Sequence, residues 1–136
     1  MPISPIDPCG FTKMVCERMM DDYNAACGLK SVRLRYFNAA GVDSDGEIGE
    51  EHEPEAHLIP LVIATALGRG AAVRLFGTDY PTSNGTAIRD YVHVADPASA
   101  HVKALTHLLA GGESMAVNLG TGRGISVYGN CSPHAL

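Results

Sequence analysis

Basic residues are few in this sequence and never occur in a run. Lysine and arginine total 10 against 15 acidic residues, and the formal charge is -5 at pH 7. Because the basic residues are scattered singly, they form no patch suited to nucleic acid or to an anionic membrane surface. We therefore expect a small molecule as the ligand, with no nucleic acid and no membrane as partner.

Long apolar runs are missing as well. No stretch approaches the roughly 18 continuous apolar residues that a membrane span needs. The first residues, "MPISPIDP", have neither the charged start nor the apolar run of a signal peptide. With 46% hydrophobic and 18% charged residues, the composition is that of a globular protein. The sequence thus predicts a cytoplasmic protein.

Cysteines, histidines and acidic residues at the spacing of a known metal site are also absent. The four cysteines, Cys9, Cys16, Cys27 and Cys131, include no C-x-x-C pair, and the first two would lie two helical turns apart. We expect reduced thiols. His57 follows an acidic segment, residues 50–55, but its consecutive carboxylates match no zinc or calcium spacing. A solvated acidic loop without a metal is the expected structure there.

Helical and short-strand patterns alternate along the chain. A cap at Asp7-Pro8 and the closing Gly28 bound the first expected helix, and others are expected over 57–70 and from Asp96-Pro97 to Gly111. Strands are expected over 31–37, 73–76, 88–94 and 115–120, with a long polar loop over 38–55. This alternation is typical of an α/β layer.

The apolar positions make the first expected helix amphipathic, and those of the third are expected to face a core. In the first helix they recur at steps of three and four residues, and in the third they form one stripe. These positions are Phe11, Met14, Val15, Met19, Met20, Tyr23 and Ala26, followed by Ala100, Val102, Leu105, Leu108 and Leu109.

The two ends do not fit the alternation. The chain opens on a helix with no preceding strand, and its last nine residues, "YGNCSPHAL", show no period. We expect a fold that is incomplete at both ends, with a partial domain over 1–127 and an atypical tail over 128–136.

Five motifs then occur in one order: "KSVRLRYFNAAG", "EAHLIPLVIATALGR", "FGTDYPTSNGTAIRDYVHVAD", "AHVKAL" and "NLGTG". Together they resemble the C-terminal half of the UDP-glucose 4-epimerases, which are extended short-chain dehydrogenases/reductases. The resemblance implies the end of a doubly wound Rossmann sheet plus a smaller sugar-nucleotide domain. It also implies NAD as hydride carrier and the interconversion of UDP-glucose and UDP-galactose in galactose metabolism.

The family's catalytic motif, Y-x-x-x-K, aligns with "CGFTK" at residues 9–13. Lys13 matches the lysine, which implies contact with the nicotinamide ribose; an ordinary exposed lysine is the alternative. Cys9 stands where the tyrosine belongs. A thiol is acidic enough, at about 8.5 against about 10 for a phenol, but its sulfur lies too close to the backbone to reach a sugar hydroxyl. We expect Cys9 to have no catalytic role.

Other ligand contacts follow from the resemblance alone. Tyr36 and Phe37 would flank the nicotinamide, unless they are simply core residues. Arg89 would pair with the diphosphate, unless it forms a surface ion pair. The remaining implied substrate contacts are Asn38, His57, Leu58, Phe76 and Tyr91.

One glycine-rich loop, "GTGRG" at 120–124, follows an expected strand. Its glycines have the wrong spacing for a dinucleotide loop, so a turn is expected, and the resemblance places the family's own loop before Met1. Three functions therefore remain open. The chain is part of an epimerase that is inactive alone, a non-catalytic remnant that dimerises through the helix over 11–27, or a module that binds UDP-sugars without chemistry.

Overall fold

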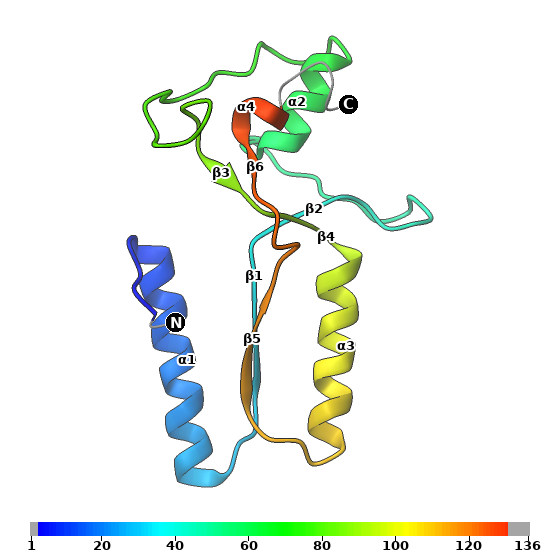
Figure 1. Ribbon diagram of the computed structural model, residues 1–136. Coiled ribbons are helices and arrows are strands. Elements are labelled where there is room, and N and C mark those ends of the chain that lie inside the picture. The colour runs from blue at the N-terminus through cyan, green and yellow to red at the C-terminus, as the bar shows by residue number, and fades with distance from the viewer. Residues whose placement is uncertain (1–2, 131–136) are drawn as a thin grey trace. The chain divides into compact units, whose positions relative to one another are not determined.

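The computed structural model describes residues 3–130. The chain divides into two compact units (Figure 1). The first consists of the residues up to Arg35 together with Ala98–Asn118, and the second of Tyr36–Pro97 together with the residues from Leu119 onward.

The first helix, α1 (Pro8–Cys27), has the boundaries that its capping residues predict. The Asp7 carboxylate accepts a hydrogen bond from the Gly10 N–H at 2.7 Å, and Pro8 occupies the first turn. At the other end Gly28 adopts a left-handed conformation and donates to the carbonyl of Asn24 at 2.9 Å. The expected helix is confirmed at both ends.

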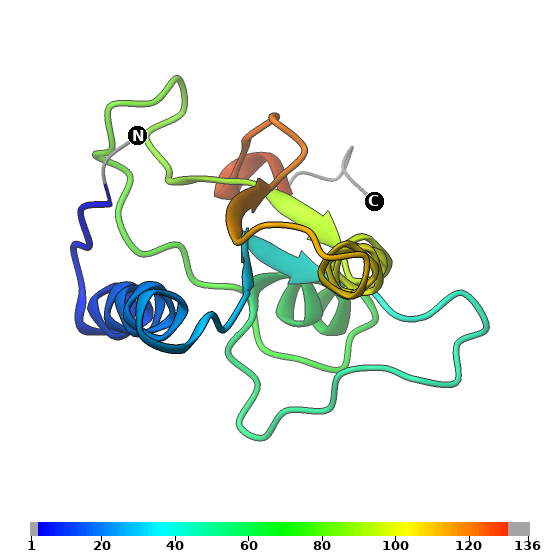
Figure 2. The same ribbon diagram turned by 90° about the horizontal axis from the view of Figure 1, so that it is seen from below.

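In the first unit, β1 (Val32–Tyr36) pairs with β5 (Met115–Leu119). The helices α1 and α3 (Ala95–Leu109) lie on opposite sides of this pair (Figure 2). A two-stranded sheet between two helices is an α/β arrangement, as the alternating patterns predict.

The second unit contains two further strand pairs. β2 (Asn38–Ala40) runs parallel to β4 (Tyr91–His93), and β3 (Ile88–Arg89) runs antiparallel to β6 (Ile125–Ser126). The unit also holds α2 (Leu58–Ala66) and the short α4 (Val127–Asn130).

Several element boundaries differ from the expected ones. Residues 73–76 form no strand, and the expected strand over 88–94 is broken at Asp90 into β3 and β4. The helix expected over 57–70 ends at Ala66. Strands β2 and β6 have no counterpart among the expected elements. The start of the predicted tail, residues 128–130, belongs to α4, and the rest of that tail, 131–136, lies outside the described residues.

The apolar face of α3 that was expected to lie in a core is mostly exposed, and that prediction was wrong; the apolar face of α1 is mostly exposed as well. Within the first unit, each of these helices packs on one side of the β1–β5 pair (Figure 2). Val92 on β4 and Pro97 in α3 are buried. The exposed positions are Phe11, Val15, Met19, Met20, Tyr23, Ala26, Val102, Leu105 and Leu109, whereas Met14, Ala100 and Leu108 are half-buried.

Within residues 3–130, no helix combines the length and the apolar character that crossing a membrane requires.

Candidate functional site

Asn38 is held at the start of β2 by the main chain of Asp90. The backbone N–H of Asn38 donates to the Asp90 carbonyl at 3.1 Å, and the side-chain Nδ2 donates to the same oxygen at 3.0 Å. A side-chain amide carries two N–H donors and one acceptor oxygen. The second Nδ2 hydrogen therefore remains available to donate a hydrogen bond to a phosphate oxygen.

Two other predicted ligand residues lie beside this contact. Tyr91 pairs with Asn38 in the register of β2 and β4, and Arg89 is the last residue of β3, directly before Asp90. Arg89 is exposed and forms no ion pair with any residue that the structure describes. The surface ion pair considered for it is therefore not observed, and Asn38, Arg89 and Tyr91 are brought together.

The Asp90 carboxylate closes the glycine-rich loop over 120–124. Its Oδ1 accepts from Thr121 Oγ1 at 2.7 Å and from the Thr121 N–H at 3.2 Å, and its Oδ2 accepts from the Gly122 N–H at 3.2 Å. The Thr121 hydroxyl, followed by these backbone N–H groups, lowers the pKa of the Asp90 carboxyl below its usual range, against a smaller opposing effect of burial.

This arrangement bears on whether the loop fits a dinucleotide. A phosphate loop presents free backbone N–H groups, but two of these are bonded to Asp90. At Gly120 an added Cβ would lie 2.7 Å from Asp90 Oδ2 and 2.9 Å from the Phe37 ring, so the space in front of the loop is filled. The loop does not fit the NAD pyrophosphate, and its backbone bends at Gly122.

His57 precedes α2, and Leu58 is the first residue of that helix. The His57 ring Nδ1 lies 2.9 Å from Glu55 Oε1 and 3.4 Å from Glu50 Oε1. The His57 N–H, more than that of Ala56, lowers the pKa of Glu55 through hydrogen bonds. The ring thus faces carboxylates, and its contact with a diphosphate stays a prediction.

The three predicted aromatic contacts are exposed. Tyr36 ends β1 and Phe37 lies between β1 and β2, and both side chains are about half exposed. They are not core residues, which removes the alternative considered for them. Phe76 lies outside any helix or strand and is 86% exposed. Their roles against nicotinamide and uracil stay predictions.

Lys13 and Cys9 are both exposed residues of α1, one turn apart. They belong to the first unit, whereas the Asn38 cluster belongs to the second. Cys9, Cys16 and Cys27 are free thiols, as expected, and Cys131 lies outside the described residues. In the described part of the chain, no group of three or more histidine, cysteine and acidic residues is placed to hold a metal ion.

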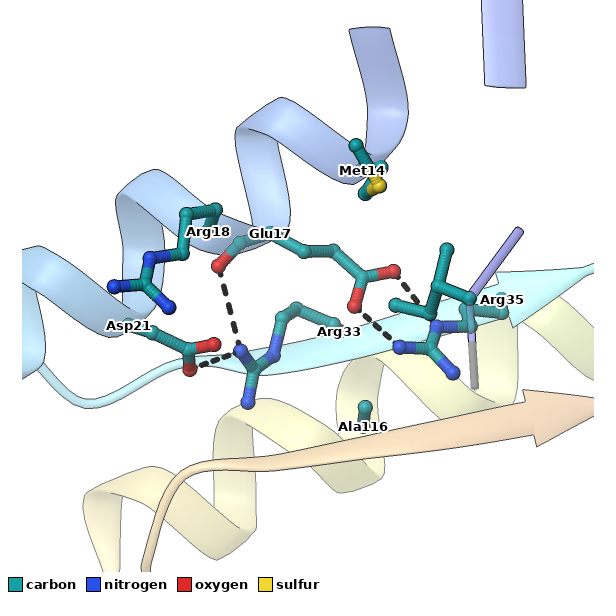
Figure 3. A pocket seen from close by; sticks show the side chains of 8 residues that line it. Met14, Glu17, Arg18, Asp21, Arg33, Arg35 and Ala116 are labelled. Carbon is teal, nitrogen blue, oxygen red and sulfur yellow. Dashed lines mark hydrogen bonds and ion pairs between the residues drawn. The ribbon is translucent and has the colours of Figure 1, made fainter. Parts of the chain in front are cut away.

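The helix that carries Lys13 is held to β1 by charged side chains (Figure 3). Glu17 accepts two bonds from Arg35, at 2.7 Å from Nε and 2.5 Å from Nη2, and Asp21 pairs with Arg33. These residues line an open hollow of about 370 Å³. The hydrogen bonds from Arg35 lower the pKa of Glu17, and the same contact raises the pKa of Arg35.

We expect Glu17→Gln to lower the free energy of unfolding by about 1 kcal/mol at pH 7, because one partner of a two-bond ion pair loses its charge. The Glu17 pKa in the folded state lies below its ordinary value of 4.5, so the contribution is complete above that pH and is lost as the pH falls through the folded-state pKa. Denaturant titrations at neutral and acid pH should show the difference between the two proteins shrinking in acid.

The matched control is Asp22→Asn. Asp22 pairs with Arg18 at 3.2 Å, but the two side chains are 63% and 77% exposed, against 18% for Glu17. An equal loss of stability in both variants would contradict the role assigned to the Glu17–Arg35 pair.

Sequence reasoning missed Glu17 and Asp90. Asp90 carried a usable signal, since aspartate is disfavoured within strands and stands in the middle of the strand expected over 88–94. Glu17 carried a weaker one, its position one turn after Lys13 on the same helix.

Comparisons with known proteins identify relatives of this chain. The UDP-glucose 4-epimerase of Rhizobium meliloti (strain 1021) is 59% identical over 124 residues, which are 91% of this chain and 38% of that protein. The crystal structure of UDP-glucose 4-epimerase from Brucella ovis in complex with NAD superposes with a TM-score of 0.85 at 54% identity, covering 92% of this chain and 38% of that one.

A third relative has a sugar nucleotide bound. It is the UDP-glucose 4-epimerase from Stenotrophomonas maltophila with bound NAD and formylated UDP-arabinopyranose, with a TM-score of 0.83 at 43% identity, covering 92% of this chain and 38% of that one. The chain thus spans about 38% of the length of these relatives. Residues 1–120 match the model of the NAD dependent epimerase/dehydratase family, and the chain belongs to that family.

Proposed function

We propose that this chain supplies the sugar-nucleotide-binding part of a UDP-glucose 4-epimerase, an enzyme of galactose metabolism. Arg89 and Asn38 bind the diphosphate, with Tyr91 beside them. A guanidinium suits phosphate oxygens because its N–H groups donate in parallel. Leu58, His57 and Phe76 are proposed as further substrate contacts.

One observation supports this proposal most strongly. Asn38 and Arg89 are separated by 50 intervening residues in the sequence, yet both the backbone and the side-chain N–H of Asn38 bond to the carbonyl of the residue that follows Arg89. The Arg89 guanidinium, which forms no described ion pair, and the remaining N–H of the Asn38 amide therefore belong to residues that are joined through Asp90. That is the chemistry that a diphosphate requires.

We propose that the isolated chain does not catalyse epimerisation. Cys9 replaces the acid/base tyrosine, and the glycine-rich loop at 120–124 bonds to Asp90 and not to a pyrophosphate. In a complete epimerase NAD would act as the hydride carrier, with Lys13, Tyr36 and Phe37 at its nicotinamide end. The cytoplasm, where free thiols persist, is the proposed compartment.

A homodimer through the helix over 11–27 is proposed as well. The side chains of Phe11, Met19, Met20 and Tyr23 leave an apolar face of α1 exposed, and methionine-rich faces adapt readily to a partner. Sedimentation at high protein concentration tests this: a monomer alone would contradict it.

The binding function is tested by thermal unfolding of the 136-residue chain with and without UDP. A ligand that binds only the folded state at about ten times its Kd adds roughly 1.4 kcal/mol of stability, which corresponds to a rise in Tm of a few degrees. Uridine at the same concentration, which lacks the diphosphate, should raise Tm much less. An unchanged Tm at saturating UDP would contradict the proposal.

A further inference from the structure

We propose that Asp90 is a positioning residue for the sugar-nucleotide site, and that it holds Arg89 and Asn38 in their binding arrangement through its bonds to Thr121 and Gly122. This inference rests on the proposed function, because it takes Arg89 and Asn38 as the diphosphate ligands. It adds a residue that has no predicted contact with the substrate.

The first step in the argument is the position of Asp90 between two strand pairs. β3 ends at Arg89 and is antiparallel to β6, and β4 begins at Tyr91 and is parallel to β2. Asp90 is the single residue at which the chain passes from one pairing to the other. Its backbone position therefore determines how Arg89 on β3 lies relative to Asn38 on β2.

The second step is that hydrogen bonds hold both the backbone carbonyl and the side-chain carboxylate of Asp90. Its carbonyl oxygen accepts hydrogen bonds from the backbone N–H of Asn38 at 3.1 Å and from Asn38 Nδ2 at 3.0 Å. Its carboxylate accepts three bonds from Thr121 and Gly122, which lead into β6. Three donors on one carboxylate make a charge-assisted contact, the stronger class of hydrogen bond.

The third step is that position 120, next to the Asp90 carboxylate, has room only for glycine. A Cβ at Gly120 would lie within 3 Å of both Asp90 Oδ2 and Phe37 Cδ2. The carboxylate of Asp90 and the ring of Phe37, the residue that precedes Asn38, thus both lie close to Gly120. Close packing beside three hydrogen bonds limits the arrangements that the carboxylate can adopt, which a positioning residue requires.

The positioning role and simple charge repulsion predict opposite changes in UDP affinity when the Asp90 carboxylate is removed. The Asp90 carboxylate is adjacent in sequence to Arg89 and would repel a bound diphosphate, so its removal should strengthen UDP binding if charge alone mattered. If Asp90 positions Arg89 and Asn38, its removal should weaken UDP binding in spite of the lost repulsion.

The test is UDP affinity, measured by calorimetry, in the 136-residue chain. Asp90→Ala is expected to weaken UDP binding roughly tenfold, and Thr121→Val, which removes one donor from the other side, by a smaller factor. Thr121→Ser retains the hydroxyl and should restore the affinity. Asp45→Ala, which removes an exposed carboxylate elsewhere in the second unit, is the matched charge control and should not weaken binding.

A second readout does not depend on the ligand. In Asp90→Ala and Thr121→Val without UDP, the side-chain amide resonances of Asn38 should shift and exchange faster with solvent, whereas Thr121→Ser should keep the unsubstituted spectrum. Thr121→Val keeps the shape of the side chain and provides the test if Asp90→Ala does not fold.

The outcomes are distinguishable. Weaker UDP binding in Asp90→Ala and Thr121→Val, with rescue by Thr121→Ser, supports the positioning role. Equal or tighter binding in the two disrupting variants, or an unchanged Asn38 amide, overturns it and leaves the proposed function intact. No UDP binding by the unsubstituted chain overturns both proposals.

Discussion

Replacing Cys9 by tyrosine is expected to raise kcat by roughly 100-fold to 10,000-fold in a complete epimerase that contains this chain, the range that a positioned general acid/base contributes. The enzyme to use is the Rhizobium meliloti UDP-glucose 4-epimerase with its 124 matched residues exchanged for those of this chain. Lys13 is already present one helical turn away on α1, at the spacing of the family's Y-x-x-x-K motif.

Cys9→Phe is the matched control for this prediction. Phenylalanine supplies the aromatic ring without the hydroxyl, so a rate increase that came from packing alone would occur in both variants. We expect the increase only with tyrosine, measured as the conversion of UDP-galactose to UDP-glucose at saturating substrate. Comparable turnover by the Cys9→Tyr variant and by the enzyme that retains Cys9 would show that the thiol, or another group, performs the proton transfer.

Replacing Arg89 by alanine is expected to raise the Kd for UDP roughly 10-fold to 100-fold in the 136-residue chain, because a hydrogen-bonded charge pair contributes about 1.5 to 3 kcal/mol. Arg89→Lys should recover part of this loss, since an ammonium keeps the charge but not the paired geometry of the guanidinium. Calorimetric titration with UDP measures both effects.

Arg69→Ala is the charge-matched control for Arg89. Arg69 is exposed, follows α2 in the same unit, and has no assigned ligand contact. We expect it to leave the Kd nearly unchanged, because an exposed charge that makes no ligand contact contributes little at physiological salt. Equal losses in the two variants would mean that UDP responds to net charge and not to a site at Arg89.

The boundaries of α1 were predictable because its capping residues bond only to groups that are close in the sequence. Asp7 bonds to an N–H three residues away, and Gly28 to a carbonyl four residues away. The sequence contains both partners of each contact. The spacing of the glycines in the loop over 120–124 likewise indicated that it is no dinucleotide loop.

The pairing around Asp90 could not be predicted in the same way. The bonds from Asp90 to Thr121 and from Asn38 to Asp90 join residues 31 and 52 positions apart. No local preference encodes such contacts, so the strand expected over 88–94 was not divided and β6 was missed. The positions of these hydrogen bonds are set by the pairing of β2 with β4 and of β3 with β6.

The exposed faces of α1 and α3 show a different limit. Helical periodicity indicates which side chains share a face, but it does not indicate whether a described element covers that face. Met14 and Met19 belong to the same apolar set on α1, yet Met14 is half-buried beside β1 and Met19 is exposed. Burial depends on the neighbouring layer, which the period of one helix does not specify.

The most direct test of the proposed function is a titration of the isotope-labelled chain with UDP, followed by NMR. We predict saturable shifts at the Asn38 side-chain amide and at the backbone amides of Arg89, Asp90 and Tyr91, with smaller changes at Thr121. An absence of shifts at saturating UDP, or shifts confined to α1, would contradict the assignment of the diphosphate site to this cluster.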